Sequence, residues 1–134
     1  MNGVIVDSNV ILDIFLDDPN WAEWSEKTLN QYGASGSLYI NPIIYTEVSI
    51  GFHRIEELEA VMEAAGFQML TIPKEALFLA GKAFMAYRNN RGTKSSTLSD
   101  FFIGAHAAVL GIALITRDTA RYRTYFPTVS LIMP

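Results

Sequence analysis

Five short apolar runs recur along the chain, and segments with helical spacing separate them. The runs cover residues 4–6, 38–40, 68–72, 113–116 and 129–133. Strands that alternate with helices predict a mainly parallel sheet whose two faces are covered by helices. Strands in such a sheet are buried on both faces and are therefore almost wholly apolar, as these runs are. The sequence thus predicts an α/β protein with a mainly parallel five-stranded sheet.

The segments between the runs carry signals for the beginnings and ends of helices. In chain order, the predicted helices are 21–32, 42–52 with a continuation over 56–65, 73–88, and a last one that ends at Leu110. Pro42 and Pro73 stand at predicted helix starts, where proline is tolerated. Gly66 and Gly111 follow two of the helices, and glycine readily takes the left-handed conformation that ends a helix.

Length and composition restrict the classes of protein to which this chain can belong. Its 134 residues are enough for one domain with a real core, and half of them are apolar, which excludes a disordered chain. No apolar run approaches the roughly 18–20 residues that span a bilayer. The first residues lack the basic flank and cleavage site of a secretory signal, so an intracellular protein is expected. The absence of cysteine excludes disulfides and cysteine-based zinc sites.

Polar residues stand where the predicted strands end. In open parallel sheets, sites form beyond the carboxyl ends of the strands. Asp7 follows the first strand, Asn41 follows the second and Asp118 follows the fourth. Pro73 closes the third strand, and no acid stands there. The sequence therefore places its candidate chemistry first at Asp7 and Asp118.

Two further carboxylates lie within predicted helices. Glu47 stands among the isoleucines and valine of segment 42–50, and a charge in apolar surroundings is costly unless it is paired or binds a metal. Asp100 falls in the first turn of segment 98–110, which is otherwise apolar and typical of a buried helix. An exposed position on an amphipathic face is the alternative for Glu47. Stabilisation of the helix dipole is the alternative for Asp100.

The remaining acids and the histidines have simpler interpretations. Asp13, Asp17 and Asp18 are expected to be turn and surface residues, since Asp is common in turns. His53 is expected on a solvated helix face. His106 stands among alanines and is interpreted as a hydrogen-bonded core histidine, because no second histidine has the spacing of a zinc site.

Four carboxylates are thus predicted on one side of the sheet: Asp7, Glu47, Asp100 and Asp118. Carboxylates at one site repel one another and stay ionised together only beside cations. Their oxygens are hard ligands that favour Mg²⁺ or Mn²⁺. Such ions, acting with a phosphate, imply metal-assisted phosphodiester cleavage. Polar neighbours predicted to orient the carboxylates or bound water are Ser8, Asn9 and Thr116.

Three longer stretches carry a family resemblance. They are VIVDSNVILDIF from residue 4, INPIIYTEVSIGF from residue 40 and LSDFFIGAHAAVLGIALITRDTARYRTYFPTVSLIMP from residue 98. In this order they resemble the PIN domain family and, within it, the VapC-type toxin ribonucleases of toxin–antitoxin pairs. The resemblance implies a single domain over 1–134 with a three-layer α/β/α fold and strand order 3-2-1-4-5. It also implies Mg²⁺- or Mn²⁺-dependent RNA cleavage, with the acidic-site role carried by Asp7, Glu47, Asp100 and Asp118 and a supporting role by Thr116.

The resemblance further implies partners and a location. Family members are commonly homodimers held inactive by a cognate antitoxin, in the cytoplasm of a bacterium or archaeon. One departure concerns the metal count. Many relatives carry a further acid shortly after the fourth, whereas Thr119, Ala120 and Arg121 follow Asp118 here. A full second metal site is therefore in question.

Basic residues form two groups near these acids, although the formal net charge is −4. Cations beside an acidic site help it admit a polyanion, and clustered Arg and Lys contact phosphates. The predicted RNA-binding residues are Arg88, Arg91, Lys94, Arg117 and Arg121. The alternative is that both groups are only solvated faces of the protein.

Two other enzyme-like functions are disfavoured by inspection. An aspartyl-phosphate phosphatase usually has a second acid two residues after its nucleophile, where this chain has Asn9. A phospho-receiver domain needs an acceptor Asp after the third strand, where Ile72 and Pro73 stand. A PIN-like module that is catalytically weak and acts only by binding a protein partner remains the alternative to a nuclease.

Overall fold

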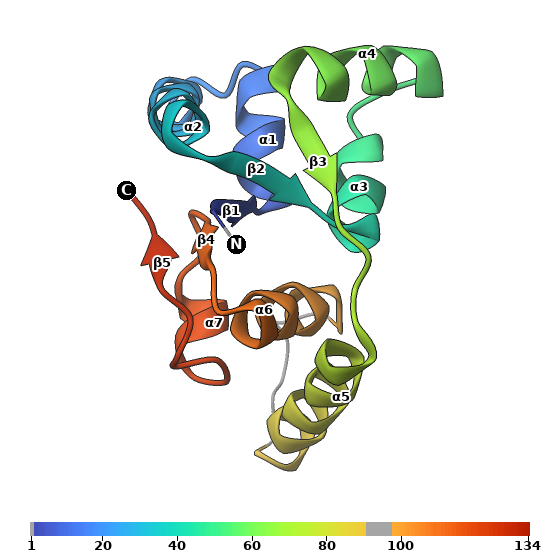
Figure 1. Ribbon diagram of the computed structural model, residues 1–134, viewed down its shortest axis with the longest axis vertical. Helices are drawn as coiled ribbons and strands as arrows, with labels where there is room; N and C mark the ends of the chain where they lie inside the picture. The colour runs from blue at the N-terminus through green and yellow to red at the C-terminus, as the bar shows by residue number, and fades with distance from the viewer. Residues whose placement is uncertain (1, 91–97) are drawn as a thin grey trace.

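The computed structural model describes residues 2–90 and 98–134, and its centre is a five-stranded sheet (Figure 1). The strands are β1 (Gly3–Val6), β2 (Ser37–Ile40), β3 (Phe67–Met69), β4 (Ala113–Ile115) and β5 (Leu131–Ile132). All neighbouring strands are parallel, and their order is β3-β2-β1-β4-β5. The predicted α/β class, parallel sheet and strand order are confirmed.

Strand β1 lies at the centre of the sheet and of the core. Ile5 is paired with Tyr39 of β2 on one side and with Leu114 of β4 on the other. Ile5, Val6 and Leu114 are completely buried. This explains why β1 is apolar at every position, since both of its faces and both of its edges are covered.

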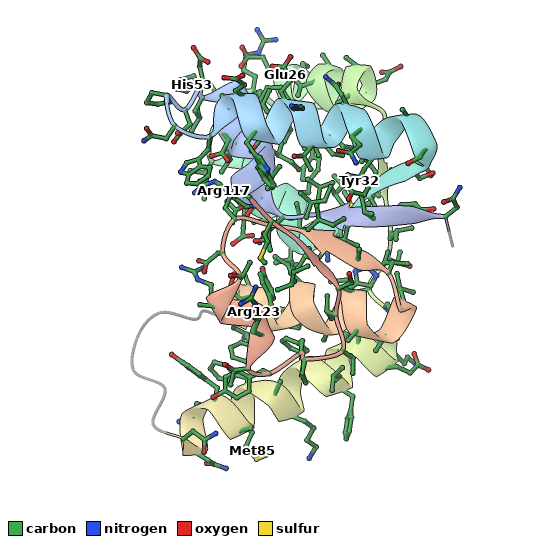
Figure 2. All side chains as sticks on the ribbon, turned by 90° about the vertical axis from the view of Figure 1, so that its left-hand side faces the viewer. Glu26, Tyr32, His53, Met85, Arg117 and Arg123 are labelled. Atoms are coloured by element: carbon green, nitrogen blue, oxygen red, sulfur yellow. The ribbon has the colours of Figure 1, made fainter. Side chains whose placement is uncertain are left out.

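Helices cover both faces of the sheet. Within the described residues they are α1 (Ser8–Phe15), α2 (Ala22–Ser35), α3 (Pro42–Ser49), α4 (Ile55–Ala65), α5 (Lys74–Asn89), α6 (Leu98–Leu110) and α7 (Ala120–Arg123). Figures 1 and 2 show α1 and α2 on one side of the sheet and α6 on the other, with α5 packed outside α6. The described residues contain no helix long and apolar enough to cross a membrane.

Helix boundaries follow the signals in the sequence. The side chain of Asp7 accepts a hydrogen bond from the backbone N–H of Ser8 at the start of α1, and the side chain of Asn41 accepts one from Ile44 at the start of α3. Gly66 ends α4 with φ 77°, and Gly111 follows α6 with φ 66°. A Cβ at Gly104 would collide with the ring of Phe126, so glycine lets α6 pack closely there.

Several predicted boundaries differ from the structure. Strand β3 ends at Met69 instead of residue 72, because its partner β2 ends at Ile40 and offers no further ladder. The predicted 42–52 helix ends at Ser49, and the backbone turns there as the N–H of Gly51 donates to the carbonyl of Val48. His53 therefore lies in an exposed bend and not on a helix face. The short helix α7 was not predicted.

Candidate active site

A pocket of about 280 Å³ lies at the carboxyl ends of β1 and β4. The pocket is lined by Asp7, Ser8, Asn9, Glu47, Asp100, Arg117, Asp118 and Arg121. Asp7 and Asp118 follow the two neighbouring central strands, while Glu47 comes from α3 and Asp100 from the first turn of α6. The fold thus brings together all four carboxylates that the sequence singled out, from segments up to 111 residues apart (Asp7 to Asp118).

Asp7 is buried and held by three elements. Its Oδ1 accepts a hydrogen bond of 2.8 Å from the backbone N–H of Ser8. Its Oδ2 accepts two more, one of 2.8 Å from the Thr116 hydroxyl and one of 2.8 Å from the Tyr122 hydroxyl. Only 4% of the residue is exposed. The carboxylate is therefore fixed in orientation before any ligand binds.

Burial sets the ionisation of Asp7 and Tyr122. The pKa of Asp7 is raised from 3.8 to about 6, mainly because burial desolvates the carboxylate. The charge of Glu47 adds to the rise, and the hydrogen bonds from Tyr122, Thr116 and Ser8 oppose it. Desolvation, together with the charges of Asp7 and Asp100, raises the pKa of Tyr122 well above its usual 10. The Tyr122 hydroxyl therefore stays protonated and donates a hydrogen bond to Asp7.

Glu47 faces Asp7 across Ser8. The Ser8 hydroxyl donates to Glu47 Oε1 at 2.8 Å and lies 3.4 Å from Asp7 Oδ1. The Ser99 hydroxyl donates to Glu47 Oε2 at 3.1 Å. Glu47 itself is half-buried. Two hydroxyls thus fix this carboxylate on the α3 side of the pocket.

Asp100 and Asp118 are joined by Arg121. Arg121 Nη1 lies 3.1 Å from Asp100 Oδ2, and Arg121 Nε lies 2.6 Å from Asp118 Oδ2. Burial lowers the pKa of Arg121, but the charges of Asp100 and Asp118 outweigh burial, so its pKa is raised overall. The guanidinium that the sequence suggested for RNA binding therefore points into the acidic pocket.

The prediction that Asp13 is a surface residue was wrong. A surface position was expected, but the residue is only 4% exposed. Arg117 binds both of its oxygens, with Nε 2.6 Å from Oδ2 and Nη2 2.8 Å from Oδ1, and the Ser25 hydroxyl donates to Oδ2 at 2.9 Å. The Arg117 guanidinium also lies over the ring of Trp21, 5.2 Å from its centroid. The physical reason for burial is this bidentate cation, which satisfies the carboxylate inside the protein.

The segment that follows β4 is tied to α1 by further polar contacts. The Thr116 hydroxyl, besides donating to Asp7, accepts the backbone N–H of Asp118 at 3.0 Å. The backbone N–H of Arg117 approaches Asn9 Oδ1 at 3.4 Å, and Asn9 Nδ2 approaches the Thr116 hydroxyl at 3.5 Å. Ser8, Asn9 and Thr116 thus lie beside the carboxylates that they were predicted to orient. Asp17 and Asp18 lie in the turn after α1, as predicted.

The other basic residues lie elsewhere or outside the described residues. Arg88 is near the end of α5 and lines a separate pocket with Met85, which Figure 2 shows at the far end of the molecule from His53. Arg91 and Lys94 fall outside the described residues, 2–90 and 98–134. The structure thus places Arg117 and Arg121 at the acidic pocket and Arg88 away from it.

His106 lies in the core, as predicted. It is 1% exposed, and its Nδ1 is 3.1 Å from Asn41 Nδ2. Burial lowers its pKa, which favours the neutral ring. Its Nε2 has no hydrogen-bond partner within the part of the chain that the structure describes. The residue does not line the acidic pocket.

Three residues at or behind the site were not predicted in these roles: Tyr122, Ser99 and Asp13. A tyrosine in the stretch Arg121–Phe126 gives no sign that its hydroxyl reaches a carboxylate 115 residues away. Ser99 stands directly before Asp100 in the sequence, and this position was a usable signal. Asp13 could have been linked to Arg117 only through the fold.

The chemistry that this pocket offers a ligand is that of hard oxygen donors, which suit Mg²⁺ or Mn²⁺. Among residues 2–90 and 98–134, however, no three acidic or histidine side chains are arranged to hold one ion together. Ser8 stands between Asp7 and Glu47, and Arg121 stands between Asp100 and Asp118. The donor set fits a divalent ion, and binding one requires the side chains between the carboxylates to rearrange.

Comparison with known proteins places this geometry in a family. Residues 4–127 match the model of the PIN domain. Comparison with curated protein sequences finds no significant match. Three solved structures share the fold at low identity. They are VapBC2 from Rickettsia felis bound to a promoter DNA fragment (TM-score 0.74, 14% identity, 97% of each chain), DNA-bound VapBC from Salmonella typhimurium (0.72, 19%, 99% of this chain and 98% of that one) and a toxin–antitoxin complex from Klebsiella pneumoniae (0.68, 20%, 98% of each).

The family match spans the strands and helices that supply the acidic pocket, from β1 through α7. The matched residues 4–127 include the four acids Asp7, Glu47, Asp100 and Asp118. The parallel sheet of order 3-2-1-4-5 and the sequence stretches that first suggested the resemblance agree with it. The chain therefore belongs to the PIN domain family.

Proposed function

We propose that this chain is a single-domain, metal-dependent endoribonuclease that cleaves RNA phosphodiester bonds. The observation that carries the proposal is the convergence of Asp7, Glu47, Asp100 and Asp118 on one pocket of a PIN fold. PIN domains are typically nucleases that use Mg²⁺ or Mn²⁺. RNA as the substrate is proposed from the sequence resemblance to VapC-type toxin ribonucleases.

In this proposal the four carboxylates hold the ion. When bound, Mg²⁺ or Mn²⁺ supplies an activated water and neutralises charge on the phosphate. The chain's own residues supply the positioning. Thr116 and Tyr122 fix Oδ2 of Asp7, and Ser8 and Ser99 fix the two oxygens of Glu47. The Asp7 carboxylate held in this way loses little further freedom when a ligand binds, whereas Ser8 must move from between Asp7 and Glu47 to admit an ion.

We further propose that the chain is the toxin of a toxin–antitoxin pair. Support comes from the solved structures that share its fold, since one is named a toxin–antitoxin complex and two are VapBC complexes. A cognate antitoxin, a homodimeric state and a cytoplasmic location are proposed on the same ground, together with the sequence resemblance.

Metal removal gives the first test of the nuclease. We expect labelled RNA to be cleaved in Mg²⁺ or Mn²⁺ and cleavage to fall by at least about 100-fold in EDTA, because metal activation supplies several kcal/mol. Excess Mn²⁺ should restore it. Cleavage that persists in EDTA would contradict the metal mechanism. Mn²⁺ binding without any cleavage would favour the alternative, a catalytically weak module that binds a protein partner.

Salt dependence tests the basic groups. Replacing Arg91 and Lys94 by Glu should weaken RNA binding and reduce the slope of log affinity against log salt by about 0.7 for each phosphate that is no longer neutralised. Binding is measured in EDTA, where cleavage is not expected. The control pair is Lys27→Glu with Arg54→Glu, two exposed positions that give the same change of charge. An unchanged slope in the Arg91 and Lys94 variant would exclude phosphate binding there.

A further inference from the structure

Arg121 occupies an unusual position for a residue of an acidic pocket. Its Nη1 lies 3.1 Å and 3.3 Å from the two carboxylate oxygens of Asp100, and its Nε lies 2.6 Å from Asp118 Oδ2. The guanidinium therefore stands between two of the four carboxylates that line the pocket. A positive charge of the chain itself already sits where those two acids converge.

The surroundings of Arg121 allow it to leave this position. Its side chain is 36% exposed, and that of Asp118 is 37% exposed, while that of Asp100 is only 8% exposed. Arg121 also sits on α7, a helix of four residues at the edge of the pocket. The guanidinium thus has solvent on one side, whereas the Asp100 carboxylate stays in the protein interior.

We propose that Arg121 is a tethered cation that neutralises Asp100 and Asp118 in the metal-free protein and competes with a divalent ion for these two carboxylates. The inference rests on the proposed metal site. Removing Asp100 from water without a cation beside it would be costly, and Arg121 supplies that cation before metal arrives. A divalent ion that enters this half of the pocket must displace the guanidinium or bind against its repulsion.

The competition has two consequences for the site. The protein binds a divalent ion more weakly than its four carboxylates alone would, because part of their charge is already neutralised. A displaced guanidinium remains at the mouth of the pocket, on the same short helix, where a phosphate of the substrate can meet it. Arg121 is therefore a positioning residue for the metal and a candidate contact for RNA, as the sequence suggested.

Isothermal titration of the whole chain with Mn²⁺ tests the competition directly. We expect Arg121→Gln to bind Mn²⁺ about tenfold more tightly, since a unit charge roughly 6 Å from a divalent ion changes affinity by about this factor even in the dielectric of water. Arg123→Gln is the matched control. It removes the same charge from the same helix, but Arg123 is exposed, contacts Met133 and does not line the pocket. Its affinity should stay within about twofold of the parent chain.

A conservative variant and a second measurement distinguish the loss of the Arg121 charge from a general folding defect. Arg121→Lys keeps the positive charge and should bind Mn²⁺ nearly as the parent does. In EDTA, Arg121→Gln should melt below the parent, because Asp100 and Asp118 both lose their ion pair with Arg121. Added Mn²⁺ should raise its melting temperature by more than that of the parent.

The outcomes separate this inference from the nuclease proposal. Equal Mn²⁺ affinity in the parent and in Arg121→Gln, or weaker binding in the variant, would overturn the competition while leaving the metal site in place. An equal gain in affinity in Arg123→Gln would also overturn it, because the effect would then be one of net charge. If neither the parent nor any of the three variants binds Mn²⁺, the metal site fails and the competition with it.

Discussion

Asp7→Asn is expected to reduce RNA cleavage by at least about 1,000-fold, which corresponds to about 4 kcal/mol of transition-state stabilisation. The substitution keeps the size of the side chain but removes the negative charge at the centre of the pocket. Asparagine offers a metal only one neutral oxygen, so affinity for Mg²⁺ falls together with catalysis. The measurement is the single-turnover rate of RNA cleavage at saturating Mg²⁺ or Mn²⁺.

The same variant should be no less stable than the parent protein at pH 7. The pKa of Asp7 is raised from 3.8 to about 6, so between these values the folded protein holds a proton that the unfolded chain has lost. The stability contributed by Asp7 therefore falls as pH rises through this window, by about 3 kcal/mol in total. Asparagine cannot lose a proton, and it can still accept the N–H of Ser8.

Urea denaturation in EDTA at pH 4 and at pH 7 measures this dependence. The stability of Asp7→Asn relative to the parent should rise between the two pH values. Comparing the two proteins cancels the titration of the other groups. A relative stability that does not change with pH would mean that folding does not shift the pKa of Asp7.

Asp17→Asn is the matched control for Asp7→Asn. Asp17 is exposed in the turn after α1, and its φ of 49° is one that asparagine tolerates. This variant loses one carboxylate of the same sequence segment without touching the pocket. Cleavage and stability should both stay near those of the parent. A large loss of cleavage in Asp17→Asn, or its survival in Asp7→Asn, would contradict the assignment of the site.

Arg117→Met is expected to cost about 3 kcal/mol of unfolding free energy, the lower end of the range for breaking a buried ion pair. Asp13 is 4% exposed on its side chain and Arg117 26%, so water relieves only part of the loss. Without Arg117, the Asp13 carboxylate must stay charged beside Ser25 alone or take up a proton. The segment 116–118 also loses its ion pair with α1 and keeps the weaker contacts with Asn9, so metal affinity should fall as well. Urea denaturation at pH 7 measures the main effect.

Arg54→Met provides the control for this ion pair. Arg54 and Glu56 lie 3.4 Å apart, but their side chains are 70% and 68% exposed, and such pairs contribute less than about 1 kcal/mol. Adding Asp13→Asn to Arg117→Met should recover part of the lost stability, because no buried charge then remains. A loss in Arg117→Met as small as that in Arg54→Met would show that Asp13 is not held by this pair.

Local sequence signals predicted the sheet and the main carboxylates well. Asp7 stands out because an apolar strand stops at it. Gly111 was predicted to follow the end of a helix, and the structure shows it after α6 with a φ of 66°, which suits glycine. Asp100 and Glu47 were identified as charges inside apolar helices. These signals depend on neighbours within a few residues, which is why they can be read without the fold.

Signals that depend on distant partners failed. Asp13 follows Asn9 by one helical turn in α1, yet its classification as a surface residue was wrong because its partner Arg117 lies 104 residues away. The hydroxyl of Tyr122 reaches Asp7 across 115 residues, and nothing near either residue announces the contact. Arg121 was interpreted only as a cation for RNA, and its position between Asp100 and Asp118 was not predicted.

The sequence by itself therefore determined the α/β class, most helix boundaries to within a few residues and the acids at the strand ends, because hydrophobic periodicity and capping act locally. Only the tertiary structure decided which charges are paired, because pairing depends on where the parallel strands and their crossovers bring distant segments. It made Asp13 a buried partner of Arg117, fixed Asp7 with Tyr122 and set Arg121 inside the pocket. Burial then raised the pKa of Asp7, and Arg121 neutralised part of the negative charge of Asp100 and Asp118.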